Sequence, residues 1–242
     1  MLIIPTSQGL AQERANRIAL IIGNSSYPDA STPLSTTVRD ARVLADEFKR
    51  LGFDVELQEN LGKEEMKRAI AGFTAKVQNG TEALFYFGGI GLQAGRRSFL
   101  IPVNAQIWSE TDVTREGVGV DDLLAELNRR GAKVKIIIVD AARRNPFERR
   151  FRASPAGLAP LGAPDGTLAL FSAAPGSLVT ERDGEQTSIL VTELIKELRS
   201  PNQTAEQAFN RTRIGVSRAS NGENVPWVAS SLLDEIYFRG SG

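Results

Sequence analysis

The sequence predicts an α/β fold in which a mostly parallel central sheet carries helices on both faces. Short apolar runs rich in isoleucine and valine, such as Arg17 to Gly23 and Val134 to Val139, are typical of strands buried on both faces. Segments with helical spacing of apolar residues separate these runs. Because strands and helices alternate, we expect parallel strands joined by helical crossovers.

The first half of the chain supplies three strands and two helices. The opening strand, Arg17 to Gly23, ends at turn-forming residues, and apolar residues then recur every three or four positions from Thr37 until Gly52 closes the helix. The same two patterns repeat further along. The segments expected are strands at Arg17 to Gly23, Phe53 to Leu57 and Thr81 to Phe87, and helices at Thr37 to Leu51 and Glu64 to Val77.

The second half continues the alternation and adds one long loop. A glycine-rich turn is expected at Gly88 to Gly91, and Asp140 to Asp165 is a long loop rich in Arg, Pro and Gly. The remaining strands expected are Ser98 to Val103, Val134 to Val139, Thr167 to Ser172 and, as a possible last strand, Glu235 to Phe238. The remaining helices expected are Asp121 to Arg130, Thr187 to Leu198 and Thr204 to Val216.

Composition excludes several kinds of chemistry. The 242 residues include neither cysteine nor histidine, so thiol nucleophiles, thiolate ligands and imidazole bases are all missing. No acidic cluster has ligand spacing, and we expect neither a metal nor a cofactor. The 29 basic and 29 acidic residues balance, which gives no indication of a nucleic-acid partner. No apolar run is long enough to span a bilayer.

Residues 1–14 differ from the rest and are interpreted as a leader or as the remnant of a secretory signal. Leu2 to Ile4 and then Gly9 to Ala11 resemble the end of such a signal, which favours a periplasmic or secreted protein. A disordered leader on a cytoplasmic protein is the alternative. Residues 15–239 are expected to form a single domain.

Ligands of parallel sheets bind beyond the carboxyl ends of the strands, and three segments qualify for that position. They are Asn24 to Asp40, Gly88 to Gly91 and Asp140 to Asp165. In these segments the chain resembles the bacterial caspase-like peptidases, namely the orthocaspases or metacaspase-like proteins. The matching stretches are RIALIIGNSSY, VRDA, LFYFGGIG, IIIVDAARRNPF, LFSAAPG and VPWVASSLL, in the family's order. The resemblance implies a caspase-like fold for residues 15–239.

The resemblance also implies a cysteine endopeptidase that cleaves after Arg or Lys, but the catalytic positions depart from the family. Ile90 stands where the family has its histidine, and Ala142 stands where it has its cysteine. A thiolate must attack the scissile carbonyl and an imidazole must move the proton. We therefore expect a pseudoenzyme, a peptidase homologue without activity; an engineered knockout is the alternative reading of the two positions.

The two aspartates that the resemblance implies for substrate binding are both present. Asp40 and Asp140 match the two aspartates that line the family's pocket for a basic side chain. Guanidinium groups suit paired carboxylates, so a peptide or protein with exposed Arg or Lys is the expected partner. An arginine of the basic loop 143–152 is a second candidate occupant. Alternatively, both aspartates only satisfy backbone donors at a helix start and a strand end.

Two rival functions remain open. The first is an active hydrolase with an unrecognised nucleophile, for which Ser172, at the end of an expected strand, is a candidate that lacks a histidine base. In the pseudoenzyme interpretation Ser172 lines the binding pocket instead. The second rival is a scaffold that pairs with another chain through a sheet edge.

Overall fold

The central sheet of the computed structural model has six strands in the order β2-β1-β3-β7-β8-β9. The structure describes residues 16–30, 34–151, 156–180 and 184–239. All neighbours in this sheet are parallel apart from β8 and β9. The strands are β1 (Arg17–Gly23), β2 (Asp54–Glu59), β3 (Glu82–Gly88), β7 (Val134–Asp140), β8 (Thr167–Phe171) and β9 (Trp227–Ser230). The central strands β1, β3 and β7 are almost wholly buried, which explains their unbroken apolar sequences.

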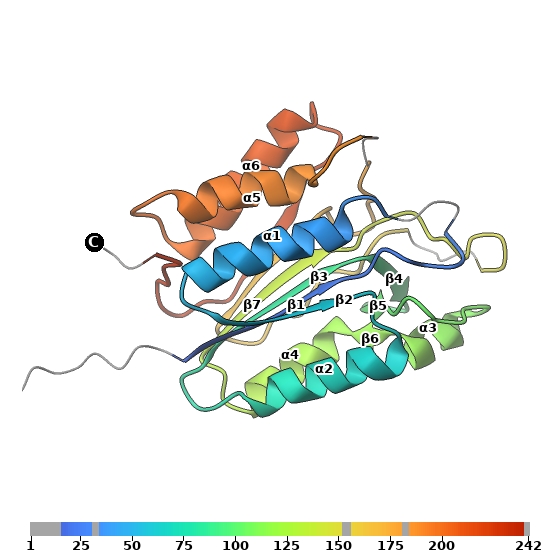
Figure 1. Cartoon of the computed structure of the whole chain (residues 1–242), viewed down its shortest axis with the longest axis horizontal. Coiled ribbons are helices and arrows are strands. Elements are labelled where there is room, and N and C mark those ends of the chain that lie inside the picture. Colours follow the sequence, from blue (N-terminus) through green and yellow to red (C-terminus); the bar gives the residue numbers. More distant parts are fainter. Residues whose placement is uncertain (1–15, 31–33, 152–155, 181–183, 240–242) are drawn as a thin grey trace, which may run out of the picture.

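Helices cover both faces of the sheet (Figure 1). One face carries α1 (Thr37–Arg50), α5 (Ile189–Arg199) and α6 (Ala205–Ala219), and the other carries α2 (Lys63–Ala75) and α4 (Val120–Arg129). Each layer encloses its own apolar cluster, as expected when a parallel sheet is packed on both sides. The predicted α/β fold with a mostly parallel sheet is confirmed.

A second sheet of three short strands stands beyond the carboxyl end of β3. It consists of β4 (Ile90–Ala94), β5 (Arg97–Ile101) and β6 (Val118–Gly119), and α3 (Glu110–Glu116) packs against it. This sheet and α3 enclose a third apolar cluster. Neither α3 nor β6 was predicted from the sequence.

The turn predicted at Gly88 to Gly91 is wrong. Gly88 pairs with Gly23 and Asp140 inside the sheet, and β4 already begins at Ile90. These glycines serve close packing: a Cβ at Gly88 would lie 2.7 Å from the Tyr86 hydroxyl oxygen, a contact that native Cβ atoms do not make.

The possible last strand at Glu235 to Phe238 is also wrong, since β9 lies earlier and pairs antiparallel with β8. Arg17 donates hydrogen bonds to the carbonyls of Tyr237 and Phe238, so these acceptors are not used in a strand ladder. The Phe238 ring packs on Phe48 at 6.0 Å between centroids. The predicted leader, residues 1–14, lies outside the described residues.

Candidate functional site

The register of the central strands brings two distant loops together at the carboxyl end of the sheet. Gly88, the last residue of β3, pairs with Asp140, the last residue of β7. Two backbone hydrogen bonds extend this contact beyond the strands, from Gly89 N to Asp140 O at 3.1 Å and from Gly91 N to Ala141 O at 2.8 Å. The segments that carry positions 90 and 142 therefore run side by side.

Positions 90 and 142 are both apolar and both closed to solvent. Ile90 and Ala142 are each 1% exposed. Ile90 belongs to the third cluster together with Tyr27 and Phe147, whereas Ala142 belongs to the cluster on the α2 and α4 face. The Ile90 backbone N–H is also bonded to the Tyr27 hydroxyl at 3.0 Å. Neither side chain has a proton to transfer or a lone pair with which to attack a carbonyl.

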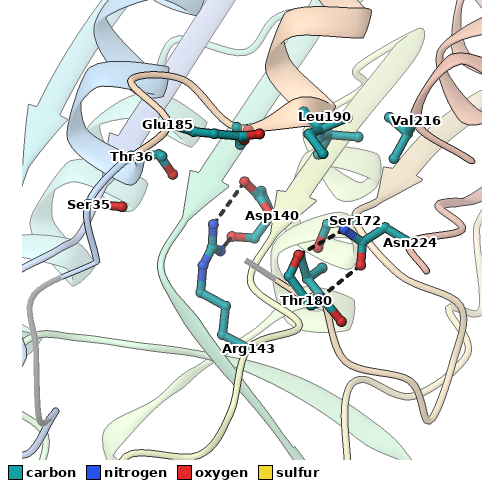
Figure 2. A pocket seen from close by; sticks show the side chains of 13 residues that line it. Ser35, Thr36, Asp140, Arg143, Ser172, Thr180, Glu185, Leu190, Val216 and Asn224 are labelled. Carbon is teal, nitrogen blue, oxygen red and sulfur yellow. Dashed lines mark hydrogen bonds and ion pairs between the residues drawn. The ribbon is translucent and has the colours of Figure 1, made fainter. Parts of the chain in front are cut away.

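Asp140 is held in a buried ion pair with an arginine three residues further along. Arg143 Nη2 lies 3.1 Å from Asp140 Oδ2, and the two side chains are only 4% and 2% exposed. Arg143 Nη1 also donates to the carbonyl oxygens of Gly89, at 3.1 Å, and of Asp140. Figure 2 shows the guanidinium group reaching from the loop to the Asp140 carboxylate. Arg143 thus contacts the backbone of both segments, at Gly89 and at Asp140, and also pairs with the Asp140 carboxylate.

Asp40, in the first turn of α1, has a different partner. Its Oδ1 accepts a hydrogen bond from the backbone N–H of Ser188 at 3.0 Å, and Ser188 is the N-cap residue of α5. Its other oxygen, Oδ2, has no hydrogen-bond partner among the described residues. Burial, followed by the negative charge of Asp140, raises the pKa of Asp40 from 3.8 to about 7. Asp40 is therefore poised between its neutral and charged forms near neutral pH.

A small cavity of about 40 Å³ lies beside this ion pair. Asp140, Arg143 and Ser172 line it, as do Thr36 and Ser188, which adjoin Asp40; the Asp40 side chain itself does not. The Ser172 hydroxyl is buried and has no hydrogen-bond partner among the described residues. The room beside the ion pair is therefore on the order of a few water molecules.

The basic loop after Asp140 is anchored at a second point. The Arg150 guanidinium lies 4.4 Å from the centre of the Trp108 ring and pairs with Asp29. Arg144, in contrast, is exposed and pairs with Glu148 at 2.8 Å. Arg152 lies outside the described residues. Within the described part of this loop, it is Arg143 that reaches the site.

Two tyrosines contribute to the site without having been predicted. Tyr27 donates its hydroxyl hydrogen to the Ile101 carbonyl at 2.8 Å and accepts the Ile90 N–H, so it fixes the start of β4. Tyr86 is fully buried, and its hydroxyl has no partner among the described residues. Burial, with the charges of Asp140 and Asp40, raises the pKa of Tyr86 well above its usual value. Both look like ordinary strand or turn aromatics in the sequence.

Across the described ranges, Asp and Glu side chains do not gather in groups of three that could hold a metal ion. The helices of these ranges are all too short or too polar to cross a bilayer.

Comparison with known proteins places the chain in a family. Residues 16–237 match the family model described as "Caspase domain". A stretch of 100 residues, 41% of this chain, is 31% identical to mucosa-associated lymphoid tissue lymphoma translocation protein 1 of Homo sapiens, and 103 residues are 33% identical to its homologue from Mus musculus. Each match spans 12% of the length of the relative. Because the family model covers nearly the whole described structure, the chain belongs to the caspase domain family.

Proposed function

We propose that this chain is a catalytically inactive, caspase-like domain of the bacterial orthocaspase or metacaspase-like branch. The observation that carries the proposal is the absence of both cysteine and histidine from the whole sequence. Cysteine peptidase chemistry needs a thiolate and an imidazole that act as a unit, and loss of either costs orders of magnitude in rate. The burial of Ile90 and Ala142 supports the same conclusion, because a substrate carbonyl could not reach them.

The activity test uses fluorogenic peptides with Arg, Lys, Asp or Leu before the cleaved bond. The purified protein is expected to give no turnover above a buffer control. The rival nucleophile, Ser172, is tested in parallel by Ser172→Ala. Its hydroxyl has no base within hydrogen-bonding distance among the described residues, so this variant should match the parent. Turnover that Ser172→Ala abolishes would establish an active hydrolase and overturn the proposal.

The retained function is binding of a peptide or protein that carries an exposed Arg or Lys. Asp40, Asp140 and Ser172 would form the receiving site, with Arg143 of the loop 143–152 as its resting occupant. Support comes from the Arg143–Asp140 ion pair and from the small volume left beside it. A guanidinium group offers a planar fork of donors that an ammonium group lacks, so arginine should bind better than lysine.

Calorimetry with short peptides ending in Arg, Lys or norleucine tests the binding. The parent should bind the Arg peptide weakly, because Arg143 must first be displaced. Arg143→Ala should strengthen binding by about 10-fold or more, since a charge-assisted hydrogen bond contributes roughly 1.5–3 kcal/mol. The exposed Arg144 supplies the control Arg144→Ala, which should behave as the parent.

Removing Arg143 also threatens the fold, so melting curves accompany the calorimetry, and Arg143→Gln supplies a milder variant. Adding Asp140→Asn to either variant should remove the gain. Equal Arg-peptide affinity in the parent, in both folded Arg143 variants and in the Arg144 control would refute the acidic pocket.

A further inference from the structure

A row of polar side chains crosses the carboxyl end of the sheet on the face that carries α1 and α5. Tyr86 belongs to the apolar cluster of that face, and so do Ile138 and Leu170. Because side chains alternate along a strand, Asp140 and Ser172, each two residues further on, face the same side. Both line the small cavity described above (Figure 2). Three neighbouring strands, β3, β7 and β8, thus contribute one polar side chain each.

Two glycines bring the Tyr86 hydroxyl between α1 and Asp140. The hydroxyl lies over Gly88, since a Cβ there would be 2.7 Å from its oxygen. Gly88 pairs with Asp140 on one side and with Gly23 on the other. The first turn of α1, which carries Asp40, lies over Gly23, where a Cβ would be 2.7 Å from a backbone oxygen of that turn. Burial, and then the charges of Asp140 and Asp40, raise the pKa of Tyr86, so both carboxylates act on this hydroxyl.

Three oxygens in this region are buried without a hydrogen-bond partner among the described residues. They are Asp40 Oδ2, Tyr86 Oη and Ser172 Oγ, and their residues are 0%, 0% and 3% exposed. Buried polar groups in folded proteins almost always have a partner. Three such oxygens from α1, β3 and the end of β8 therefore indicate an occupant that is held by oxygen ligands.

The charges in this region favour a cation over a water molecule. Asp40 and Asp140 bring two carboxylates, and Glu185 lines the adjoining cavity, whereas Arg143 supplies the one positive charge among the described residues that line it. A buried negative charge is costly unless it is paired. Water would satisfy the hydrogen bonds and leave the excess charge in place. A divalent ion such as Ca²⁺ takes about six to eight oxygen ligands, several of them carboxylate, so a monovalent cation fits the single free carboxylate oxygen better.

We propose that Asp40, Tyr86 and Ser172 bind a small monovalent cation, sodium or potassium, beside the Arg143–Asp140 ion pair. The adjoining cavity of about 40 Å³ offers room, because a water-sized particle needs only about 10–15 Å³. A bound cation holds Asp40 in its charged form and so strengthens the hydrogen bond that Asp40 accepts from Ser188 at the start of α5. The site stands whether or not a peptide binds at Arg143.

Thermal unfolding in three chloride salts tests the site. Melting temperatures are measured at about pH 8 in sodium, potassium and tetramethylammonium chloride, at an equal ionic strength of about 0.15 M. Tetramethylammonium is too large for the cavity and provides the reference. Sodium, potassium or both should raise the melting temperature of the parent by about 3 °C or more above that reference, because a ligand that binds only the folded state stabilises it by mass action.

Three variants separate this site from a general effect of salt. Asp40→Asn keeps the shape of the side chain and removes its charge, so the difference between the salts should disappear. Tyr86→Phe removes one oxygen ligand and keeps the ring, so the cation concentration that gives half of the shift should rise by about 5-fold. The matched control is Asp46→Asn, at an exposed position on the same helix, and it should respond to the salts as the parent does.

The outcomes are distinct. A rise that depends on the cation, is lost in Asp40→Asn and is kept in Asp46→Asn supports the site. Equal melting temperatures of the parent in all three salts would overturn it. So would an undiminished response in Asp40→Asn, which would mean that the salts act elsewhere on the protein. No peptide takes part, so a failure of the peptide-binding proposal and a failure of the cation site can be told apart.

Discussion

Two halves of the region at the carboxyl end of the sheet, an apolar half at positions 90 and 142 and a charged half around Asp140, are buried by opposite means. At positions 90 and 142, apolar side chains join apolar clusters, and burying them is favourable. Nearby, Asp140 at the end of β7, Arg143 in the loop that follows it and Asp40 on α1 are as deeply buried but are charged or poised to be charged. Burial of a charge is costly unless it is paired and hydrogen-bonded. Apolar packing alone therefore accounts for the burial of the first half, whereas burial of the second half requires ion pairs and hydrogen bonds between its members.

The difference predicts how the two halves respond to substitution. In the charged half, removal of one member leaves another buried without its partner, so effects should be large and dependent on pH. In the apolar half, effects should follow the volume and polarity of the new side chain. Three variants, one of them a double substitution, test this contrast.

The largest effect is expected from Arg143→Ala. It leaves the Asp140 carboxylate buried and deprives the Gly89 carbonyl of a donor, and broken buried pairs typically cost about 3–5 kcal/mol. Urea unfolding monitored by circular dichroism measures the free energy of unfolding. The control Arg144→Ala removes a highly exposed ion pair and should cost less than about 1 kcal/mol. Similar losses in the two variants would contradict the contrast.

Asp40→Asn should instead raise the free energy of unfolding. The pKa of Asp40 is raised from 3.8 to about 7 in the folded protein, so the folded state holds this proton more tightly than the unfolded state. Stability should therefore fall as pH rises from about 4 to about 7, and the full penalty persists above pH 7. Asparagine removes the charge and with it this penalty. The free energy of unfolding at pH 8 should therefore be higher in the variant by up to about 4 kcal/mol, because each pKa unit corresponds to 1.36 kcal/mol.

Asn Oδ1 can still accept the Ser188 N–H, so the helix contact is preserved. Unfolding curves recorded at intervals from pH 4 to pH 8 check the prediction. The exposed Asp46, on the same helix, provides the control Asp46→Asn, whose pH profile should match that of the parent. An unchanged profile in Asp40→Asn would show that this carboxyl is not the group that titrates.

The smallest effect is expected in the apolar half, from Ile90→His combined with Ala142→Cys. An imidazole in an apolar cluster lacks partners, which should cost about 1–3 kcal/mol. We expect no cleavage after arginine, because both positions are covered and their side chains belong to different clusters. A fluorogenic arginine substrate measures this. Cleavage by the double variant would show that both positions become accessible in solution, and cleavage by Ala142→Cys alone would contradict the need for both groups.

The sequence predicted most of the sheet because local pattern determines it. The run at Arg17–Gly23 has the predicted bounds, and Val134 to Val139 differs from β7 by one residue. Buried parallel strands carry their signal in a few consecutive residues. The short strand β6 has only two residues, and α3 has seven with Val113 as its one apolar residue, so neither shows a repeated apolar spacing.

From the sequence, candidate site residues could be named only where single residues could be matched to a family. Ile90, Ala142, Asp40 and Asp140 could be placed in this way, but their partners could not. The hydrogen bond from Ser188 to Asp40 joins residues 148 positions apart, and the Leu158 contact with Gly91 depends on how a long loop folds back. Such contacts arise from tertiary packing and leave no periodic trace in the sequence. Similarly, five arginines of the basic loop look alike until the structure assigns Arg143 to Asp140.

The hydrogen bond between Asp40 and Ser188 makes one carboxylate a shared component of two helices. Asp40 belongs to the first turn of α1, and Ser188 starts α5 and caps it by accepting the Val191 N–H. A proton or a cation that changes the charge on Asp40 therefore changes the strength of a contact that positions the start of α5. By thermodynamic reciprocity, any movement at the start of α5 must alter the affinity of Asp40 for that proton or cation to the same extent. The charged group at the carboxyl end of the sheet and the start of α5 are thus coupled through a single side chain.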